Sequence, residues 1–301
     1  MAKHAVIDLG TNTFHLLIAE RKDGGGWHPV LRERIFVKLA EEGVERIGDA
    51  AFARGLAALQ RFGQRLAAHG VPLASVRAFG TAALRTAQNA PAFLAAVLET
   101  TGIRAEAIDG QREALLIFKG VQQAVPFPDN RVLVMDIGGG SVEIVIAEAG
   151  QPVWQSSFPV GVAVLFRRFH KSDPIAPEEV AAVEAYLDVA LAGLWEALGR
   201  FPAPTLIGAA GAFDIIDHLL LDPAVKPPLY GWIPVSRFEP LYTNIIHSTL
   251  AEREKWEGLI PERREMIVVG IILIHHILRR GYMREIYTSV YSMKEGMLAE
   301  L

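Results

Sequence analysis

Two segments of this chain carry the same pattern, and this internal repeat restricts the possible folds more than any other feature. Residues 5–20 read AVIDLGTNTFHLLIAE, and residues 133–148 read LVMDIGGGSVEIVIAE. The gap-free alignment matches an aspartate, a glycine and a hydroxyl residue in the two segments: Asp8 with Asp136, Gly10 with Gly138, and Thr13 with Ser141. An apolar run, a turn of small residues and a second apolar run are typical of a β-hairpin whose turn approaches a ligand.

A second pair of features repeats in the same order. Residues 76–81 and 206–211 each read as a strand that enters a glycine turn before a helix. We therefore predict an α/β protein of two similar lobes, each with a mixed sheet flanked by helices and with an active-site cleft between them. Turn residues at 125–128 (VPFP) place the boundary there, which gives lobes of residues 1–125 and 126–301. The last helix, 293–301, belongs to the second lobe by sequence, and its return to the first lobe is left open.

Helical periodicity fills the segments between these marks. The predicted helices cover residues 49–69, 91–100, 113–124 and 175–198. The longest apolar stretch, 266–278, contains two histidines and is too short to span a bilayer, so it is interpreted as a buried helix.

Composition excludes several classes of function. The 301 residues include no cysteine, which rules out disulfides, thiolate metal sites and cysteine nucleophiles and fits a cytoplasmic location. The formal net charge of -4 gives no indication of nucleic-acid binding. The first residues lack the architecture of a signal peptide, and no membrane association is expected.

The two hairpin turns are predicted to bind phosphate, because closely spaced amides without Cβ atoms can converge on an anion. The candidate phosphate-binding residues are Gly10, Thr11, Asn12, Thr13, Gly138, Gly139, Gly140 and Ser141. A carboxylate beside a phosphate requires a cation, so Asp8, Asp136 and Glu143 are predicted to hold Mg²⁺ or another divalent cation. Sugar kinases and actin-like ATPases use the same pair of loops, so the pattern alone predicts phosphate binding and not hydrolysis.

Five motifs in order carry a resemblance to a known family. They are DLGTNTFHLLI (8–18), GTAALRTAQN (80–89), GQREA (110–114), DIGGGSVEIVI (136–146) and PER (261–263). Together they resemble the Ppx/GppA phosphatases, which are exopolyphosphatases and guanosine pentaphosphate phosphohydrolases. The resemblance covers essentially the whole chain and matches the short, two-domain form. It implies two ribonuclease-H-like lobes of the actin-like ATPase superfamily.

The resemblance also implies roles for single residues. Glu113 matches the family's general base, and Arg85 matches an arginine that binds phosphate oxygens. The implied reaction is Mg²⁺-assisted attack of water on the terminal phosphate of polyphosphate, or on the 5′-phosphate of guanosine pentaphosphate. The expected ligand is polyphosphate or guanosine penta- or tetraphosphate. A superfamily kinase or ATPase, and a catalytically weak alarmone or polyphosphate sensor, are the alternatives. Whether the chain forms a homodimer is left open.

The chain departs from the family pattern at four places. Lys38 and Lys294 stand where the family usually has arginine, Glu265 stands where aspartate is common, and residues 161–165 lack an arginine. Lysine keeps the charge but loses the planar fork of arginine. These differences leave the choice between polyphosphate and guanosine pentaphosphate open.

Overall fold

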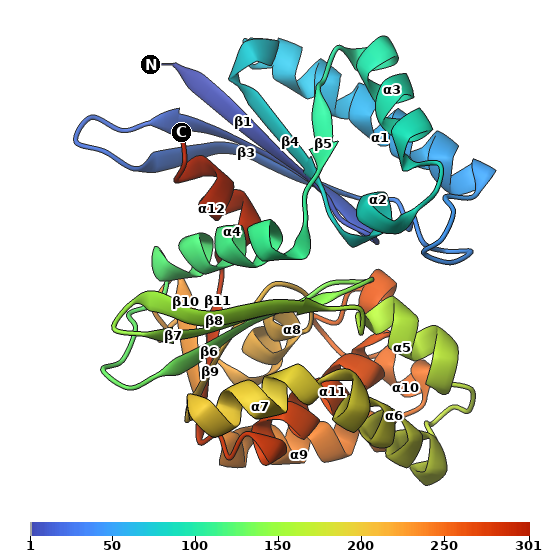
Figure 1. Cartoon of the computed structure of the whole chain (residues 1–301), viewed down its shortest axis with the longest axis vertical. Helices are drawn as coiled ribbons and strands as arrows, with labels where there is room; N and C mark the ends of the chain where they lie inside the picture. The colour runs from blue at the N-terminus through green and yellow to red at the C-terminus, as the bar shows by residue number, and fades with distance from the viewer. Residues whose placement is uncertain (1) are drawn as a thin grey trace. The chain divides into compact units, whose positions relative to one another are not determined.

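A computed structural model describes residues 2–301 and folds them into two compact α/β units (Figure 1). The first unit comprises the residues up to Leu116 together with Met293–Leu301, and the second comprises Ile117–Ser292. The division falls within helix α4 (Gly110–Gln122), ahead of the boundary that the turn residues at 125–128 indicate.

The first unit is built around a five-stranded mixed sheet of order β3-β2-β1-β4-β5. Its strands are β1 (Lys3–Leu9), β2 (Thr13–Arg21), β3 (Trp27–Phe36), β4 (Val76–Gly80) and β5 (Ala105–Ala107). Strands β1 to β3 are antiparallel, whereas β4 and β5 run parallel to β1. Its other helices are α1 (Asp49–Ala68), α2 (Ala82–Thr86), α3 (Ala90–Thr101) and α12 (Met293–Leu298).

The second unit has a six-stranded sheet of order β10-β11-β9-β6-β7-β8. Its strands are β6 (Val132–Ile137), β7 (Val142–Glu148), β8 (Gln151–Phe158), β9 (Thr205–Ala209), β10 (Tyr230–Pro234) and β11 (Glu285–Ser289). Its helices are α5 (Val162–Phe169), α6 (Pro177–Ala190), α7 (Ala192–Arg200), α8 (Gly211–Leu220), α9 (Val235–His247), α10 (Leu250–Arg253) and α11 (Ile267–Arg280).

The internal repeat of the sequence corresponds to a repeat of topology. Both hairpins form, and each is extended by a third antiparallel strand and followed by a parallel strand on its other side. The register between the second and third strands shifts at Ile18/Ala19 in one unit and at Ile146/Ala147 in the other, which are equivalent positions of the repeat. The prediction of two ribonuclease-H-like lobes with mixed sheets is confirmed.

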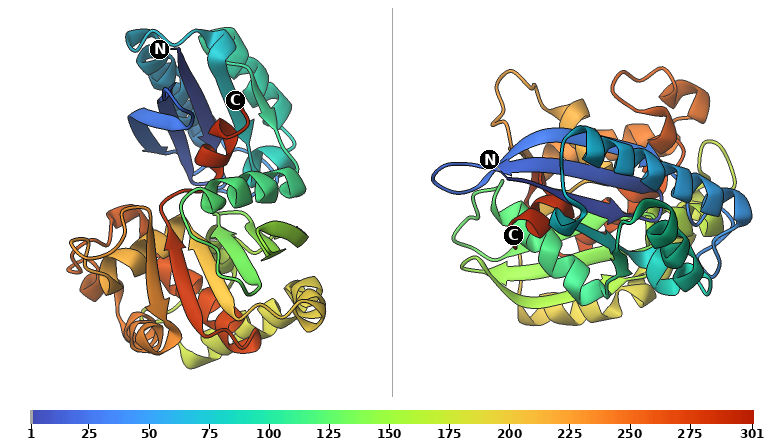
Figure 2. Two further views of the ribbon diagram at one scale, coloured as in Figure 1. Left: turned by 90° about the vertical axis from the view of Figure 1, so that its left-hand side faces the viewer. Right: turned by 90° about the horizontal axis from the view of Figure 1, so that it is seen from above.

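Alternation along β1 separates the two faces of the first sheet. Ala5, Ile7 and Leu9 join the core formed with α1 and α3, as expected for one face of a strand. Asp8 therefore points to the opposite face, where α12 packs against β1. Figures 1 and 2 show α12, in dark red, beside the blue strands of this unit.

The second unit contains the apolar helix that the sequence predicts. Eleven residues of α11 are buried, and within residues 2–301 every helix is too short or too polar to cross a membrane. The single helix predicted for 175–198 is wrong, because α6 and α7 are separate helices that meet at Leu191. Leu191 leaves the helical region with ψ 20°, and its side chain is fully buried at the junction of the two helices.

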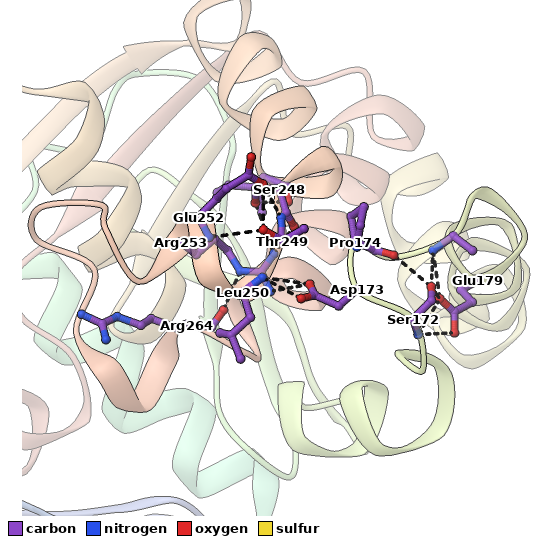
Figure 3. Close-up of polar contacts among 12 residues, drawn as sticks. Ser172, Asp173, Pro174, Glu179, Ser248, Thr249, Leu250, Glu252, Arg253 and Arg264 are labelled. Atoms are coloured by element: carbon purple, nitrogen blue, oxygen red, sulfur yellow. Dashed lines mark hydrogen bonds and ion pairs between the residues drawn. The ribbon is translucent and has the colours of Figure 1, made fainter.

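A polar network holds two loops of the second unit (Figure 3). The Arg253 side chain is 1% exposed, and it donates to the carbonyls of Ser248 and Arg264 at the two ends of one loop. Both carboxylate oxygens of Asp173 accept the Leu250 amide at 2.9 Å. These bonds satisfy main-chain groups that the loops would otherwise leave unpaired.

Glu179 is the second centre of this network. Its carboxylate accepts hydrogen bonds from the Ser172 hydroxyl and from the amides of Ala176, Lys171 and Ser172. Burial favours the neutral acid, but these donors outweigh it and lower the pKa of Glu179 from 4.5 to about 2. Glu179 thereby holds the segment 171–176, which leads into the first turn of α6.

Glu179→Gln is expected to destabilise the protein by about 1 kcal/mol at pH 7, because the amide accepts fewer and weaker hydrogen bonds. The stabilising effect of the carboxylate is fully present above pH 4.5 and is lost as the pH falls toward 2. Urea unfolding of the wild type and the variant across pH 2.5–7 should therefore give curves that converge at low pH. Glu178→Gln, an exposed neighbour in the same helical turn, is the control. A gap that stays constant with pH would contradict the assignment.

Candidate active site

The glycine loop of the second unit is held by the start of a helix. Its carbonyl groups accept hydrogen bonds from the amides around the start of α5: Gly138 from Val162 at 3.0 Å, Gly139 from Ala163 at 2.9 Å, and Gly140 from Gly161 at 3.3 Å. In a trans peptide the N–H of the next residue points the opposite way from the C=O. The amides of residues 139–141 are thus turned together away from α5, and those of Gly139 and Gly140 donate to no backbone carbonyl within residues 2–301. This arrangement can bind an anion.

Gly161 allows this close approach. A Cβ atom at this position would lie 2.4 Å from the carbonyl carbon and oxygen of Gly139 and 2.6 Å from the carbonyl carbon of Gly140. These are main-chain atoms and cannot rotate away. The segment 161–165 therefore supports the glycine loop through its backbone. This is the segment that lacks the arginine of the family pattern.

The first loop has an equivalent support from a different element. The Asn12 carbonyl accepts from the amides of Val37 and Lys38, both at 2.9 Å, and the Thr11 carbonyl accepts from Leu39 at 2.8 Å. The amides of residues 12 and 13 are consequently turned to the other side. Each turn is also closed by its own glycine, since Gly10 donates to Thr13 at 3.1 Å and Gly138 donates to Ser141 at 2.9 Å. The eight predicted phosphate-binding residues thus form two loops with the same backbone pattern.

Two of the predicted cation ligands lie side by side in the second unit. Asp136 and Glu143 are directly opposite each other on β6 and β7, so their side chains share one face of the sheet. The Glu143 carboxylate is buried and accepts the Ser157 hydroxyl at 2.7 Å, and Asp136 accepts the Ser292 hydroxyl. Neighbouring carboxylates with neutral donors suit a hard divalent cation.

Asp8 occupies the equivalent place in the first unit, opposite His15 instead of a glutamate. Burial raises the pKa of Asp8 to about 6; the Lys294 ammonium opposes this shift and the Glu295 carboxylate adds to it. Both neighbours come from α12, and Glu295 forms an ion pair with Arg32 at 2.6 Å. The sequence did not indicate that residues near the end of the chain surround Asp8.

Within residues 2–301, no three His, Asp or Glu side chains gather closely enough to hold a metal ion by themselves. Magnesium usually binds one or two carboxylates, several waters and the phosphate of its substrate. The Asp136–Glu143 pair fits that donor set without a third protein ligand.

Arg85 and Glu113 are brought together in the first unit. The Arg85 Nη1 atom donates to Glu113 Oε2 at 2.9 Å and to the Ile108 carbonyl at 3.0 Å. The remaining guanidinium nitrogens of Arg85 have no hydrogen-bond partner among the described residues. The Glu113 side chain is 8% exposed, so the ion pair fixes its direction.

Local structure explains why this pair forms. Arg85 lies on α2, directly after the Gly80 turn that ends β4, and the Gly80 carbonyl accepts the Ile108 amide at 3.0 Å. The Asp109 side chain accepts the Arg112 amide at 2.7 Å and caps α4, which places Glu113 in the first helical turn. Both ends of the pair are thus anchored to β4.

Sequence reasoning missed Ser157, Ser292, Lys294 and Glu295. The two serines carry no recognisable motif, since their relation to Asp136 and Glu143 depends on strand β8 and on the return of the chain after β11. Lys294 was noted only as a departure from a family pattern. Its proximity to Asp8 could have been found only by placing α12 beside β1.

Comparison with known proteins shows the family to which the chain belongs. The model of the Ppx/GppA phosphatase family matches residues 17–301. A guanosine-5′-triphosphate,3′-diphosphate pyrophosphatase of Photobacterium profundum is 28% identical over 99% of this chain, which spans 59% of the length of that relative. Exopolyphosphatase 1 of Mycobacterium tuberculosis is 26% identical over 97% of the chain and 86% of its own length.

A solved structure is similar throughout. The crystal structure of an exopolyphosphatase from Cytophaga hutchinsonii superposes with a TM-score of 0.93 at 36% identity, over 99% of this chain and 96% of that one. The fold is that of an α/β protein with two ribonuclease-H-like lobes, each with a hairpin loop of the same backbone pattern. The chain belongs to the Ppx/GppA phosphatase family.

Gly161→Ala is expected to weaken binding of tripolyphosphate by about tenfold or more, because the added methyl group displaces the loop whose amides are preorganised. Isothermal titration calorimetry in Mg²⁺ buffer measures this. Gly199→Ala is the matched control, since a Cβ there meets nothing within 4 Å and α7 gains a better helix former. Equal affinities in all three proteins would show that the 138–141 loop does not bind phosphate.

Asp8→Asn is expected to raise the Tm of the metal-free protein at pH 8. The folded pKa of about 6 exceeds the ordinary value of 3.8, so ionised Asp8 destabilises the fold progressively as the pH rises from 4 through 6. Below pH 4 the two proteins should melt together. Added Mg²⁺ should stabilise the wild type more than the variant. Asp23→Asn, in an exposed turn, controls for net charge. A variant less stable than the wild type at pH 8 would contradict this reading.

Proposed function

We propose that this chain is a phosphohydrolase that releases the terminal phosphate of inorganic polyphosphate, the 5′-phosphate of guanosine pentaphosphate, or both, with the help of a divalent cation. Family membership and the names of its relatives support the class of reaction. The observation that carries the proposal is the Glu113 carboxylate, which is buried in the first turn of α4 and aligned by Arg85. Phosphate binding alone would not require such a carboxylate.

Each residue then has a defined task. Glu113 orients the attacking water and takes its proton, as a general base must. Arg85 uses its remaining guanidinium donors on phosphoryl oxygens, and the amides of the two loops stabilise charge that grows on the outer oxygens in a loose transition state. Asp136 and Glu143 would hold a divalent cation in the second unit, and it would neutralise charge on the phosphate chain. Asp8 is the corresponding candidate cation ligand of the first unit.

The test is phosphate release from long polyphosphate, short polyphosphate and guanosine pentaphosphate, measured side by side with Mg²⁺. Glu113→Gln is expected to lower kcat by about 100-fold or more, because the amide cannot accept a proton. Glu99→Gln, an exposed glutamate on α3, is the control and should behave as the wild type. The compound from which phosphate is released by the wild type but not by Glu113→Gln is the substrate of the enzyme.

Two results would favour other functions. Adenine-dependent phosphoryl transfer that is insensitive to Glu113 would indicate a kinase or ATPase of the same superfamily. Tight binding of one compound by the wild type without release of phosphate from any of them would indicate a sensor.

A further inference from the structure

We propose that Arg54 is a positioning residue for the first phosphate loop. It lies on α1, outside the loop, and acts by fixing the segment 37–39 that orients the peptide groups of residues 11–13. The inference rests on the proposed function in one respect: loop 10–13 must bind phosphate.

The contacts form two successive layers. On one side, the amides of Val37, Lys38 and Leu39 donate to the carbonyls of the loop. On the other side, the Arg54 guanidinium holds the carbonyls of the same segment, with Nε at 3.0 Å from the Val37 oxygen and Nη2 at 3.5 Å from the Lys38 oxygen. Arg54 is itself held by Glu41, whose Oε2 lies 2.5 Å from Nη2. Arg54 therefore reaches the loop through one intervening stretch of backbone.

This stretch needs external support because its backbone is strained. Lys38 has a φ of 51°, in the left-handed region that residues with a Cβ rarely adopt. The turn at Lys38 separates the amides of Val37 and Lys38, which both donate to the Asn12 carbonyl, from the amide of Leu39, which donates to the Thr11 carbonyl. A strained residue persists only where its surroundings enforce the conformation, and bonds to the carbonyls on either side of the strained residue do so here.

In the second unit a helix has the supporting role that we assign to Arg54 in the first. There the loop carbonyls bind the amides around the start of α5, where the helix itself fixes the direction of successive N–H groups. Segment 37–39 is not helical, so it lacks this internal support. Arg54 donates hydrogen bonds to two adjacent carbonyls of this segment, and these side-chain bonds fix its backbone as the helix fixes the start of α5.

Other arginines of α1 provide the comparison. Arg61 and Arg65 donate to the Glu33 side chain on β3, at 2.5 and 2.9 Å, and within residues 2–301 neither donates to a loop carbonyl. All three side chains are substantially exposed, at 40% for Arg54, 57% for Arg61 and 47% for Arg65. Replacing any of them should change stability little, because exposed ion pairs contribute little. Only Arg54 is expected to change the loop.

The experiment compares Arg54→Met and Arg54→Lys with Arg61→Met and the wild type. Calorimetric titration with tripolyphosphate and Mg²⁺ should show about tenfold weaker binding in Arg54→Met, intermediate binding in Arg54→Lys and unchanged binding in Arg61→Met. Native-state hydrogen exchange should be faster at the amides of residues 37–39 in Arg54→Met and unchanged at residues 161–163. The second loop thus serves as a control inside the same molecule.

The possible results are distinct. Unchanged exchange at residues 37–39 in both Arg54 variants, or equal affinities in the Arg54 and Arg61 variants, overturns the inference. If Arg54→Met does not fold, Arg54→Lys decides by the same two measurements. A wild type that binds tripolyphosphate but releases no phosphate refutes the proposed function and leaves the role of Arg54 to be judged by binding. If the wild type releases phosphate and the Arg54 variants have the same kcat/KM as the wild type, the proposed function stands and the positioning role of Arg54 is refuted.

Discussion

A hairpin turn of small residues has no preferred direction for its peptide groups, and in both units the surrounding chain supplies one. Carbonyls of the turn are engaged from one side, by residues 37–39 in the first unit and by residues 161–163 in the second. Because the peptide is planar, fixing its oxygen also fixes its N–H. The direction of the loop amides thus depends on hydrogen bonds formed on the other side of each loop, with residues 37–39 and 161–163.

The aspartates next to the two hairpin turns, Asp8 and Asp136, also have an environment that is set by other elements of the chain. Each lies at the end of the first hairpin strand, in register with a residue of the second strand. In the second unit the partner is another carboxylate, with serine hydroxyls as donors; in the first it is His15, and the nearby charges come from Lys294 and Glu295. The repeat therefore places an aspartate at the same position of both hairpins, while its electrostatic environment differs between the two units.

The sequence predicted those parts of the fold that are encoded locally. Both hairpins, the helices at 49–69 and 91–100, and the buried helix at 266–278 follow from apolar periodicity and small-residue turns. The third strands were not predicted, because Trp27–Phe36 and Gln151–Phe158 mix polar with apolar residues and each contains a proline; they become strands by pairing with β2 and β7. The break at Leu191 was not predicted either, because leucine is a good helix former and neither glycine nor proline stands at residues 190–192.

The residues of the candidate site also fall into those that the sequence predicted and those that it did not. Loop residues and aspartates were found because the repeat aligns them, and Arg85 and Glu113 were found through family motifs; the structure adds that these two form an ion pair. Ser157, Ser292 and Lys294 were not predictable, since each approaches its carboxylate from an element distant in sequence. Such contacts appear only once the sheet order is known.

The first unit is completed by the last residues of the chain. Helix α12 packs on β1, and residues 112 and 300 form an ion pair within this unit, although nearly the whole second unit lies between them in sequence. During synthesis, β1 to β5 emerge long before α12, whereas Ile117–Ser292 is contiguous and can fold as soon as it has emerged. The lobe whose strands are made first is therefore completed only after the second unit, and its Asp8 face stays uncovered until α12 has emerged from the ribosome.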